Sequence, residues 1–473
     1  MLVRKIAYNT IISLASRILA TLIALIIVGL TTRYLGQNGF GLYSTILAFL
    51  YIFSVLADLG LYSILVRDIS KDGAPESEIA SHALSLRFWA GLFIFSVAPI
   101  VAWFFPYSFE VKAGILIASF GSWSLSNAQV LMGVFQKYLK MDKVAFAEFI
   151  CRLFQLALVG FFIWKDFGFL SLVIAYSASA FVNFLLVWFF ARKYVLIKIG
   201  WDLPYWKKML RKSFPLAISA IFVMIYFKLD TVMLSLMKSP SDVGIYSAAY
   251  KILESLIFLP AMFTGLIMPL LSRYAFGNPL EFQKVSQKTL NIFLIFSIPL
   301  AVGGIFLAGP IINLVAGQGF SAAAGILKIL IFATSIIFFG ALFSNMIVAL
   351  DKQKSLAKIY ALGAAVNFSV NLVLIPKFSY WGAASSTLLT ELLVTALMAV
   401  VIFKATKKFL NFRSSLKILL ACAPMAAILY FLTPFNILLL LPIALLVYFF
   451  SLFALKGFSI DDIASLIRRP TQP

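Results

Sequence analysis

The chain has 473 residues, of which 62% are hydrophobic, 16% aromatic and only 12% charged. A soluble chain of this length does not bury so large an apolar fraction, so the composition indicates a polytopic membrane protein. The net charge of +21 does not indicate nucleic-acid binding, because the lysines and arginines stand at the ends of apolar runs. Cys151 and Cys422 both lie within apolar runs, which predicts neither a disulfide nor a metal site.

Fourteen apolar runs follow one another along the chain, each near the length of about 20 residues that a membrane helix needs. The first run follows Arg4 and Lys5 and is too long for a signal peptide, so we interpret it as a spanning helix. The short connections leave no room for a soluble ATPase or glycosyltransferase domain. The expected spans lie near residues 10–31, 41–65, 82–105, 112–136, 146–164, 168–190, 213–236, 243–271, 287–308, 323–349, 357–376, 381–403, 415–432 and 437–455.

Two short sequences recur at nearly the same offset and in the same order. Gly41-Leu-Tyr-Ser44 returns as Gly244-Ile-Tyr-Ser247, an offset of 203 residues, each after an apolar run and a polar turn. Leu139-Lys-Met-Asp-Lys143 resembles Leu350-Asp-Lys-Gln-Lys354 at an offset of 211. Because such an offset covers an even number of crossings, we expect two halves repeated in the same orientation, with the substrate site between them near the midplane.

The predicted fold is an all-α polytopic membrane protein with about 14 transmembrane helices. It consists of two six-helix bundles that form a parallel repeat, followed by two C-terminal helices. The predicted domains are a first bundle at 1–190, a cytoplasmic linker at 191–212, a second bundle at 213–405, and the two extra helices with a cytoplasmic tail at 406–473.

The lysines and arginines outside the spans predict the orientation, since short cytoplasmic connections carry most of them. Of these residues, 28 fall on the side that holds both termini. We therefore expect a multi-pass protein of the plasma (inner) membrane with both termini in the cytoplasm. The opposite side receives only Arg33, Lys112, Lys165, Lys238 and Lys377.

Eleven charged residues remain inside the spans. At about 2.5–3.5 kcal/mol for each charge at the bilayer centre, a lipid-facing arrangement would cost roughly 30 kcal/mol, so we expect these residues to mark an interior cavity. The candidate substrate-binding cations are Arg17, Arg87, Arg152, Lys228, Lys251 and Lys328. The acids are Asp58, Glu148, Asp230, Glu254 and Glu391.

Some of these charges have a local alternative role. Glu148 and Arg152 are four residues apart, and Lys251 and Glu254 are three apart, so each couple shares a helix face and could simply neutralise itself. Spacing alone leaves both readings open. Lys228 and Asp230 are two residues apart and should extend in different directions.

Several short motifs follow one another along both halves of the chain. In the first half they are Arg33-Tyr-Leu-Gly-Gln-Asn-Gly-Phe-Gly-Leu-Tyr43, Asp58-Leu-Gly-Leu61 and Phe135-Gln136. In the second half they are Asp230-Thr-Val-Met-Leu234, Val243-Gly-Ile-Tyr-Ser-Ala-Ala-Tyr-Lys251, Asn371-Leu-Val-Leu-Ile-Pro376 and Trp381-Gly-Ala-Ala384. In this order, from about residue 5 to 405, the chain resembles the polysaccharide-biosynthesis flippases of the multidrug, oligosaccharidyl-lipid and polysaccharide (MOP) exporter superfamily.

The resemblance implies a flippase that moves a polyprenyl-(di)phosphate-linked oligosaccharide from the cytoplasmic to the outer leaflet by alternating access. Because no bond is broken, we expect the protein not to be an enzyme, to need no cofactor and to be a monomer in membrane lipid. A negative interior would favour export of a diphosphate head by roughly 5 kcal/mol per 100 mV. Antiport of H+ or Na+ is the alternative drive, with Asp58, Asp230, Glu254 and Glu391 as candidate coupling residues.

Three other functions stay open at this point. A cation-coupled multidrug exporter of the same superfamily should favour acids over bases in its cavity, and six cations against five acids argue mildly against it. A flippase for the peptidoglycan precursor is a closer variant. A membrane glycan polymerase or ligase would need a large outer loop, and the sequence has none.

Overall fold

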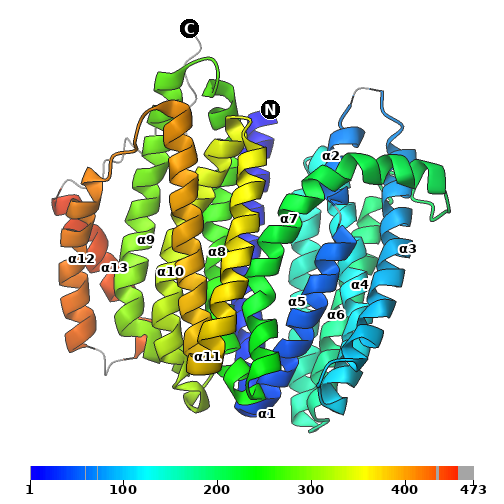
Figure 1. Cartoon of the computed structure of the whole chain (residues 1–473), viewed down its shortest axis with the longest axis horizontal. Helices are drawn as coiled ribbons and strands as arrows, with labels where there is room; N and C mark the ends of the chain where they lie inside the picture. The colour runs from blue at the N-terminus through cyan, green and yellow to red at the C-terminus, as the bar shows by residue number, and fades with distance from the viewer. Residues whose placement is uncertain (1, 59, 72, 433–435, 456–473) are drawn as a thin grey trace. The chain divides into compact units, whose positions relative to one another are not determined.

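The computed structural model describes residues 2–58, 60–71, 73–432 and 436–455 (Figure 1). All regular secondary structure in these ranges is helical, which confirms the predicted all-α class. A short 3-10 helix, Gln318–Phe320, follows α9. The α-helices are α1 (Leu2–Asp58), α2 (Leu61–Ile69), α3 (Glu76–Trp103), α4 (Phe109–Lys137), α5 (Met141–Trp164), α6 (Phe169–Ala191), α7 (Leu203–Met237), α8 (Pro240–Tyr274), α9 (Pro279–Val315), α10 (Ala323–Ala349), α11 (Gln353–Thr406), α12 (Arg413–Phe431) and α13 (Ile437–Ala454).

Two of these helices are bent and each supplies two predicted spans. The backbone of α1 leaves helical geometry at Gly36 (φ 64°), and that of α11 leaves it at Ser379 (φ 50°). A straight helix of 54 residues would be roughly 81 Å long, far more than the ~30 Å hydrocarbon layer, so α11 must turn back at its bend. The segments of α1 before and after Gly36 are called its first and second segments below.

Each of the fourteen predicted spans overlaps a helix. Ten helices in the described part of the chain are long and apolar enough to cross a membrane. The span predicted at 41–65 is not one continuous helix, because Gly60 (φ 70°) separates α1 from α2. A left-handed backbone at that position stops one helix and allows the next to start in a new direction.

The helices form two compact units. The first comprises Met1–Ser247, Val315–Gly319 and Asn371–Tyr380, and the second comprises Ala248–Leu314, Phe320–Val370 and Trp381–Pro473. This division differs from the bundle boundary expected at 191–212, because α7 and the start of α8 pack with the first unit. The repeat boundary itself stays a prediction.

The two C-terminal helices belong to the second unit. Cys422 and Met425 of α12 and Tyr448 of α13 pack in the same buried cluster as Phe293 of α9. The Tyr448 hydroxyl also donates to the carbonyl of Ile295 at 2.8 Å. The predicted tail at 456–473 lies outside the described residues.

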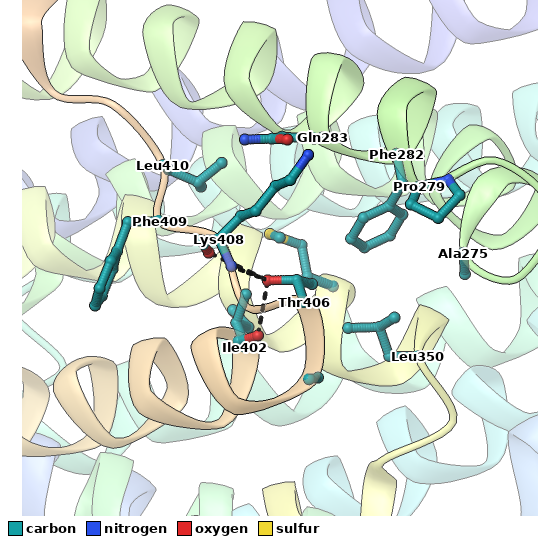
Figure 2. A pocket seen from close by; sticks show the side chains of 12 residues that line it. Ala275, Pro279, Phe282, Gln283, Leu350, Ile402, Thr406, Lys408, Phe409 and Leu410 are labelled. Atoms are coloured by element: carbon teal, nitrogen blue, oxygen red, sulfur yellow. Dashed lines mark hydrogen bonds between the residues drawn. The ribbon is translucent and has the colours of Figure 1, made fainter.

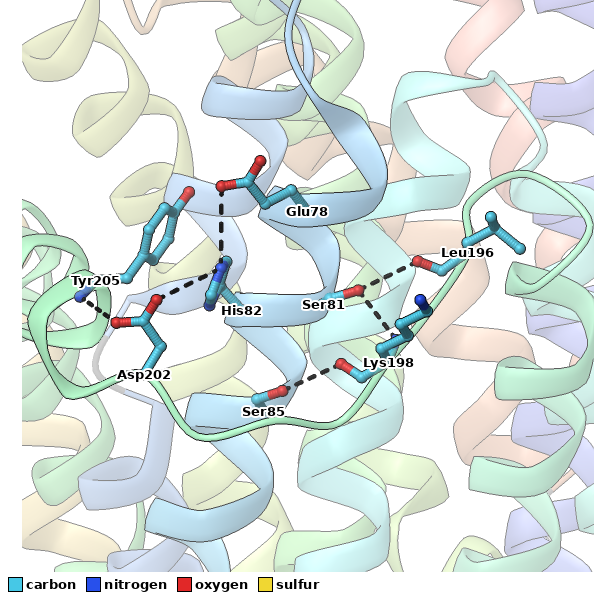
Figure 3. A network of polar contacts seen from close by, with 8 residues as sticks. All are labelled: Glu78, Ser81, His82, Ser85, Leu196, Lys198, Asp202 and Tyr205. Carbon is cyan, nitrogen blue, oxygen red and sulfur yellow. Dashed lines mark hydrogen bonds and ion pairs between the residues drawn. The ribbon is translucent and has the colours of Figure 1, made fainter.

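The segment between α6 and α7 is held on α3 by a row of serines (Figure 3). Ser77, Ser81 and Ser85 follow one another at four-residue intervals, and their hydroxyls bond backbone groups of Leu196, Lys198 and Gly200 over 3.0–3.3 Å. Four helical residues rise about 6 Å and two extended residues rise about 6.6 Å. Every fourth residue of α3 therefore lies opposite every second residue of the segment 196–200.

His82, the only histidine, joins α3 to the start of α7 beside this row (Figure 3). Its ring stacks on that of Tyr205 with centroids 3.9 Å apart. Its Nε2 lies 4.0 Å from Glu78 and 3.9 Å from Asp202, which also caps α7 by accepting from the Tyr205 N–H. This arrangement anchors the linker to the first unit.

Candidate functional site

The six predicted binding cations occupy four kinds of environment. Arg17 on α1 and Lys328 on α10 are exposed. Lys251 forms an ion pair with Glu254 at 2.8 Å, one of the two local pairings that spacing allowed. Arg87 is fully buried, whereas Arg152 and Lys228 are partly buried.

Arg87 of α3 binds the end of α1. Its Nη1 lies 3.1 Å from the Asp58 carboxylate and also donates to the Ala57 carbonyl, while Nε donates to the Ser126 carbonyl at 3.3 Å. The last carbonyls of a helix lack intrahelical donors and attract cations. Arg87 therefore neutralises Asp58 and caps the C-terminal end of α1, which lies just before α2.

Arg152 of α5 and Lys228 of α7 extend toward the second segment of α1. Arg152 donates to Gln155 Oε1 at 3.2 Å, and its guanidinium lies near the Tyr43 side chain. The Lys228 Nζ lies 5.7 Å from the ring centroid of Tyr51, a cation–π geometry. Tyr43 and Tyr51 are separated by two helical turns, roughly 12 Å. Two cations thus flank one helix segment that belongs to a candidate membrane span.

The second local pairing that spacing allowed is not formed. Among the described residues, neither Glu148 nor Arg152 has an ion-pair partner within 4.0 Å. Arg152 uses one donor on Gln155 and keeps further N–H groups in a planar fork, the geometry that matches phosphate oxygens. Arg152 is therefore the candidate cation that is best placed to take an anionic ligand.

Asp230 lies in a separate polar cluster where α7, α8 and α11 meet in the first unit. Its side chain is 2% exposed. The Tyr246 hydroxyl donates to Oδ2 at 3.1 Å, and the Asn371 amide donates to Oδ1 at 2.5 Å. The other three candidate coupling acids differ: Asp58 and Glu254 are paired with cations, and Glu391 is buried on α11.

The repeated Gly-x-Tyr-Ser sequences meet at one end of the first unit. A Cβ atom on Gly41 would lie 1.7 Å from the Pro240 carbonyl oxygen, and one on Gly244 would lie 2.1 Å from that of Gln37. Each glycine thus packs against the carbonyl four residues before the other. Only glycine permits backbones to approach this closely. We call this contact the glycine crossing.

Hydrogen bonds made by polar side chains surround the glycine crossing. Arg33 Nη1 donates to the Val315 carbonyl at 3.0 Å, and Lys238 Nζ donates to the Pro376 carbonyl at 2.8 Å. Gln37 accepts from Ser241 at 2.6 Å and donates to the Gly319 carbonyl.

Further contacts place the remaining predicted outer-side cations at this end. Tyr34 donates to Asp166, beside Lys165, at 2.6 Å. Tyr107, five residues before Lys112, shares a 3.0 Å hydrogen bond with Ser235. The fifth cation, Lys377, follows Pro376 directly. All five cations predicted for the outer side therefore lie near one end of the first unit.

Several residues of this arrangement were not singled out by the sequence. Tyr51 looked like an ordinary aromatic residue within an apolar run, and Tyr43 and Tyr246 were noted only as members of the repeated motif. The partners of all three come from other helices. The glycine crossing did have a signal, because Gly41 and Gly244 open the repeated motif. That motif indicated a repeat, but it could not indicate that its two copies touch.

Comparison with known proteins agrees with the predicted family. A family model described as polysaccharide biosynthesis protein matches residues 6–275, and the MatE model matches residues 215–373. Agl15 of Haloferax volcanii, named a probable low-salt glycan biosynthesis flippase, is 23% identical over 384 residues, 78% of this chain and 77% of that protein. AglR of the same organism, named a probable flippase, is 27% identical over 39% of each chain.

Solved structures with the same fold are transporters. The lipid II flippase MurJ in an inward closed conformation superposes with a TM-score of 0.75 at 20% identity, covering 98% of this chain and 100% of that one. An inward-facing multidrug resistance transporter of the MATE family, in the MOP superfamily, gives 0.67 at 14% identity, covering 84% and 99%. At these identities the likeness concerns the fold.

The described part of the chain, with ten helices long and apolar enough to cross a membrane, defines a multi-pass membrane protein with the fold of these structures. Because the polysaccharide biosynthesis model matches more than half of the sequence, the chain belongs to that family, as its motifs predicted.

Proposed function

We propose that the protein is a flippase that carries a polyprenyl-(di)phosphate-linked oligosaccharide from the cytoplasmic to the outer leaflet by alternating access. The observation that carries this proposal is Arg152, a guanidinium at membrane depth with no carboxylate partner among the described residues, in a chain of the polysaccharide biosynthesis family. The glycan flippase name of Agl15, which aligns over most of the chain, supports the same substrate class. The protein acts as a monomer in the inner membrane, with both termini in the cytoplasm.

The substrate has an anionic head, polar sugars and an apolar tail. Moving the head through hydrocarbon is prohibitive because its hydration is lost without replacement. In the proposed mechanism Arg152 and Lys228 contact the phosphate, while the tail remains in lipid. Lys251 is paired with Glu254, and Arg17 and Lys328 are exposed, so these three would contribute only in another state of the cycle.

Neutralising Arg152 or Lys228 tests this assignment. We expect Arg152→Gln and Lys228→Gln each to lower glycan export roughly tenfold or more, because a hydrogen bond to a charged group contributes about 1.5–3 kcal/mol. Lipid-linked glycan should accumulate in the cytoplasmic leaflet. The measurement is the leaflet distribution of the lipid-linked glycan in cells with equal amounts of each variant.

Lys165→Gln is the matched control, since Lys165 caps the same helix as Arg152 but lies on the Trp164 ring at its exposed end. Normal export by both variants would contradict the phosphate assignment. Single units exported but not polymerised would instead indicate a polymerase or ligase.

A multidrug exporter is the second candidate, because the MatE model covers residues 215–373 and Asp230 is a buried acid within that range. Drug resistance conferred by the wild type without any effect on lipid-linked glycan would favour it. A peptidoglycan-precursor flippase differs only in substrate, and export of that precursor would identify it.

We propose further that Asp230 couples transport to an ion, H+ or Na+. Its carboxylate, the Tyr246 hydroxyl and the Asn371 side chain form a buried set of oxygen and amide groups. The counterpart of Tyr246 in the repeat is Tyr43, which lies near Arg152. In this mechanism the two copies of the motif lie beside sites for ions of opposite charge. The first copy lies near the site of the substrate anion, and the second copy contributes to the site of the coupling cation.

Asp230→Asn distinguishes ion antiport from a drive by membrane potential alone. Under antiport we expect the variant to lose the stimulation of flipping by an imposed H+ or Na+ gradient in proteoliposomes. It should keep the response to an imposed potential, worth about 2.3 kcal/mol per charge per 100 mV. If the variant responds to the ion gradient and to the potential like the wild type, Asp230 is not the coupling residue.

A further inference from the structure

A pocket of about 200 Å³ opens in the second unit, and none of the charged residues described above lines it (Figure 2). Its walls come from the turn between α8 and α9, the ends of α10 and α11, and the connection that follows α11. The lining is mostly apolar and includes Phe282, Met346, Leu350, Ile402 and Leu410.

Two polar side chains stand over this apolar floor. Figure 2 shows the Lys408 side chain extending toward Gln283 across the pocket. Within the described part of the chain, neither the Lys408 ammonium nor the Gln283 amide has a hydrogen-bond or ion-pair partner. The chain is fixed here because Lys407 caps α11 in a left-handed conformation and Thr406 accepts from the Lys408 N–H at 3.4 Å.

The surroundings of the pocket have the character of a membrane interface. Phe276, Leu280 and Phe409 are 75%, 62% and 71% exposed beside it, which suits side chains in contact with lipid. Lys404 and Lys407 add positive charge, and the nearby acid Glu281 is neutralised by Lys284 at 2.7 Å. Lys408 belongs to the side that the charge distribution assigns to the cytoplasm.

We propose that this pocket binds one anionic phospholipid of the cytoplasmic leaflet. The lipid phosphate accepts hydrogen bonds from Lys408 and Gln283, and part of an acyl chain fills the apolar floor. A basic pocket between transmembrane helices on the cytoplasmic side is the kind of site that binds anionic lipid heads. An apolar floor of this size favours a phosphate that carries a tail over free phosphate.

The test measures phosphatidylglycerol retained by the purified full-length protein, by native mass spectrometry and by the rise in thermal midpoint on adding the lipid. We expect one tightly held lipid in the wild type. Lys408→Ala should weaken binding about tenfold through loss of a charged hydrogen bond. Ala405→Trp should do so by filling the pocket, whereas Lys404→Ala, which removes an equal charge outside the lining, should weaken binding much less.

Three results would overturn the proposal. The first is equal lipid retention by the wild type, Lys408→Ala and Ala405→Trp. The second is occupation by inorganic phosphate at the affinity found for phosphatidylglycerol, which would leave the apolar floor without a role. The third is a polyprenyl phosphate that displaces phosphatidylglycerol when the phospholipid is in large excess, which would identify the pocket as a substrate-tail site.

Discussion

Alanine in place of Gly244 is expected to stop glycan export while the protein still inserts and folds. The new Cβ would lie 2.1 Å from the Gln37 carbonyl oxygen and 3.2 Å from the Gly41 nitrogen, so the two helix ends must move apart. Overpacking of this kind costs about 1–3 kcal/mol, which shifts a two-state equilibrium roughly 5- to 150-fold. Because alternating access needs each end to close in turn, a crossing that no longer closes should trap the transporter.

Export and the accessibility of a cysteine at position 44 are the two measurements. Ser44 is 7% exposed beside the crossing, so a Ser44→Cys reporter should react slowly with a membrane-impermeant thiol reagent in the wild type and faster in Gly244→Ala. The native Cys151 and Cys422 are buried and would be replaced by alanine. Gly265→Ala is the matched control, since nothing lies within 4 Å of a Cβ at that glycine of the same helix. Unchanged export and labelling would show that closure of this crossing is not required.

The sequence predicted the helical segments well because the thickness of the bilayer sets their length and charges mark their ends. It predicted less well how segments join. The bend of α11 at Ser379 lies in the connection expected between the spans 357–376 and 381–403, whereas the break at Gly60 divides a span that was expected to be continuous. The break was harder to predict because the run is apolar on both sides of Gly60.

The sequence nominated charged candidate residues but could not predict their partners. Local spacing suggested two ion pairs, of which 251–254 forms and 148–152 does not, although both share a helix face. The partners that matter lie far along the chain: Asn371 is 141 residues from Asp230, and Arg87 lies on a different helix from Asp58. The i, i+4 rules describe one helix only, so they cannot reach such pairs.

Arg87→Met should lower the stability of the protein more than any other charge substitution among the candidate cations. Removing one partner of a fully buried pair costs about 3–5 kcal/mol, an upper bound here because the Asp58 side chain is 28% exposed, yet still a large part of a usual stability of about 5–15 kcal/mol. The variant leaves Asp58 without its cation and the end of α1 without its cap. We expect a clearly lower thermal midpoint in detergent and less protein in membranes.

The controls for Arg87 separate a structural role from substrate binding. Arg67→Met removes an arginine whose side chain is 53% exposed in its pair with Asp68, and should cost at most about 1 kcal/mol. Arg87→Met combined with Asp58→Asn should recover part of the midpoint, because the uncompensated charge is then gone. A phosphate-binding Arg87 would give the opposite pattern, with export lost at an unchanged midpoint and no recovery in the double variant. That outcome would return Arg87 to the binding site and imply a conformation in which α1 and α3 separate at Asp58.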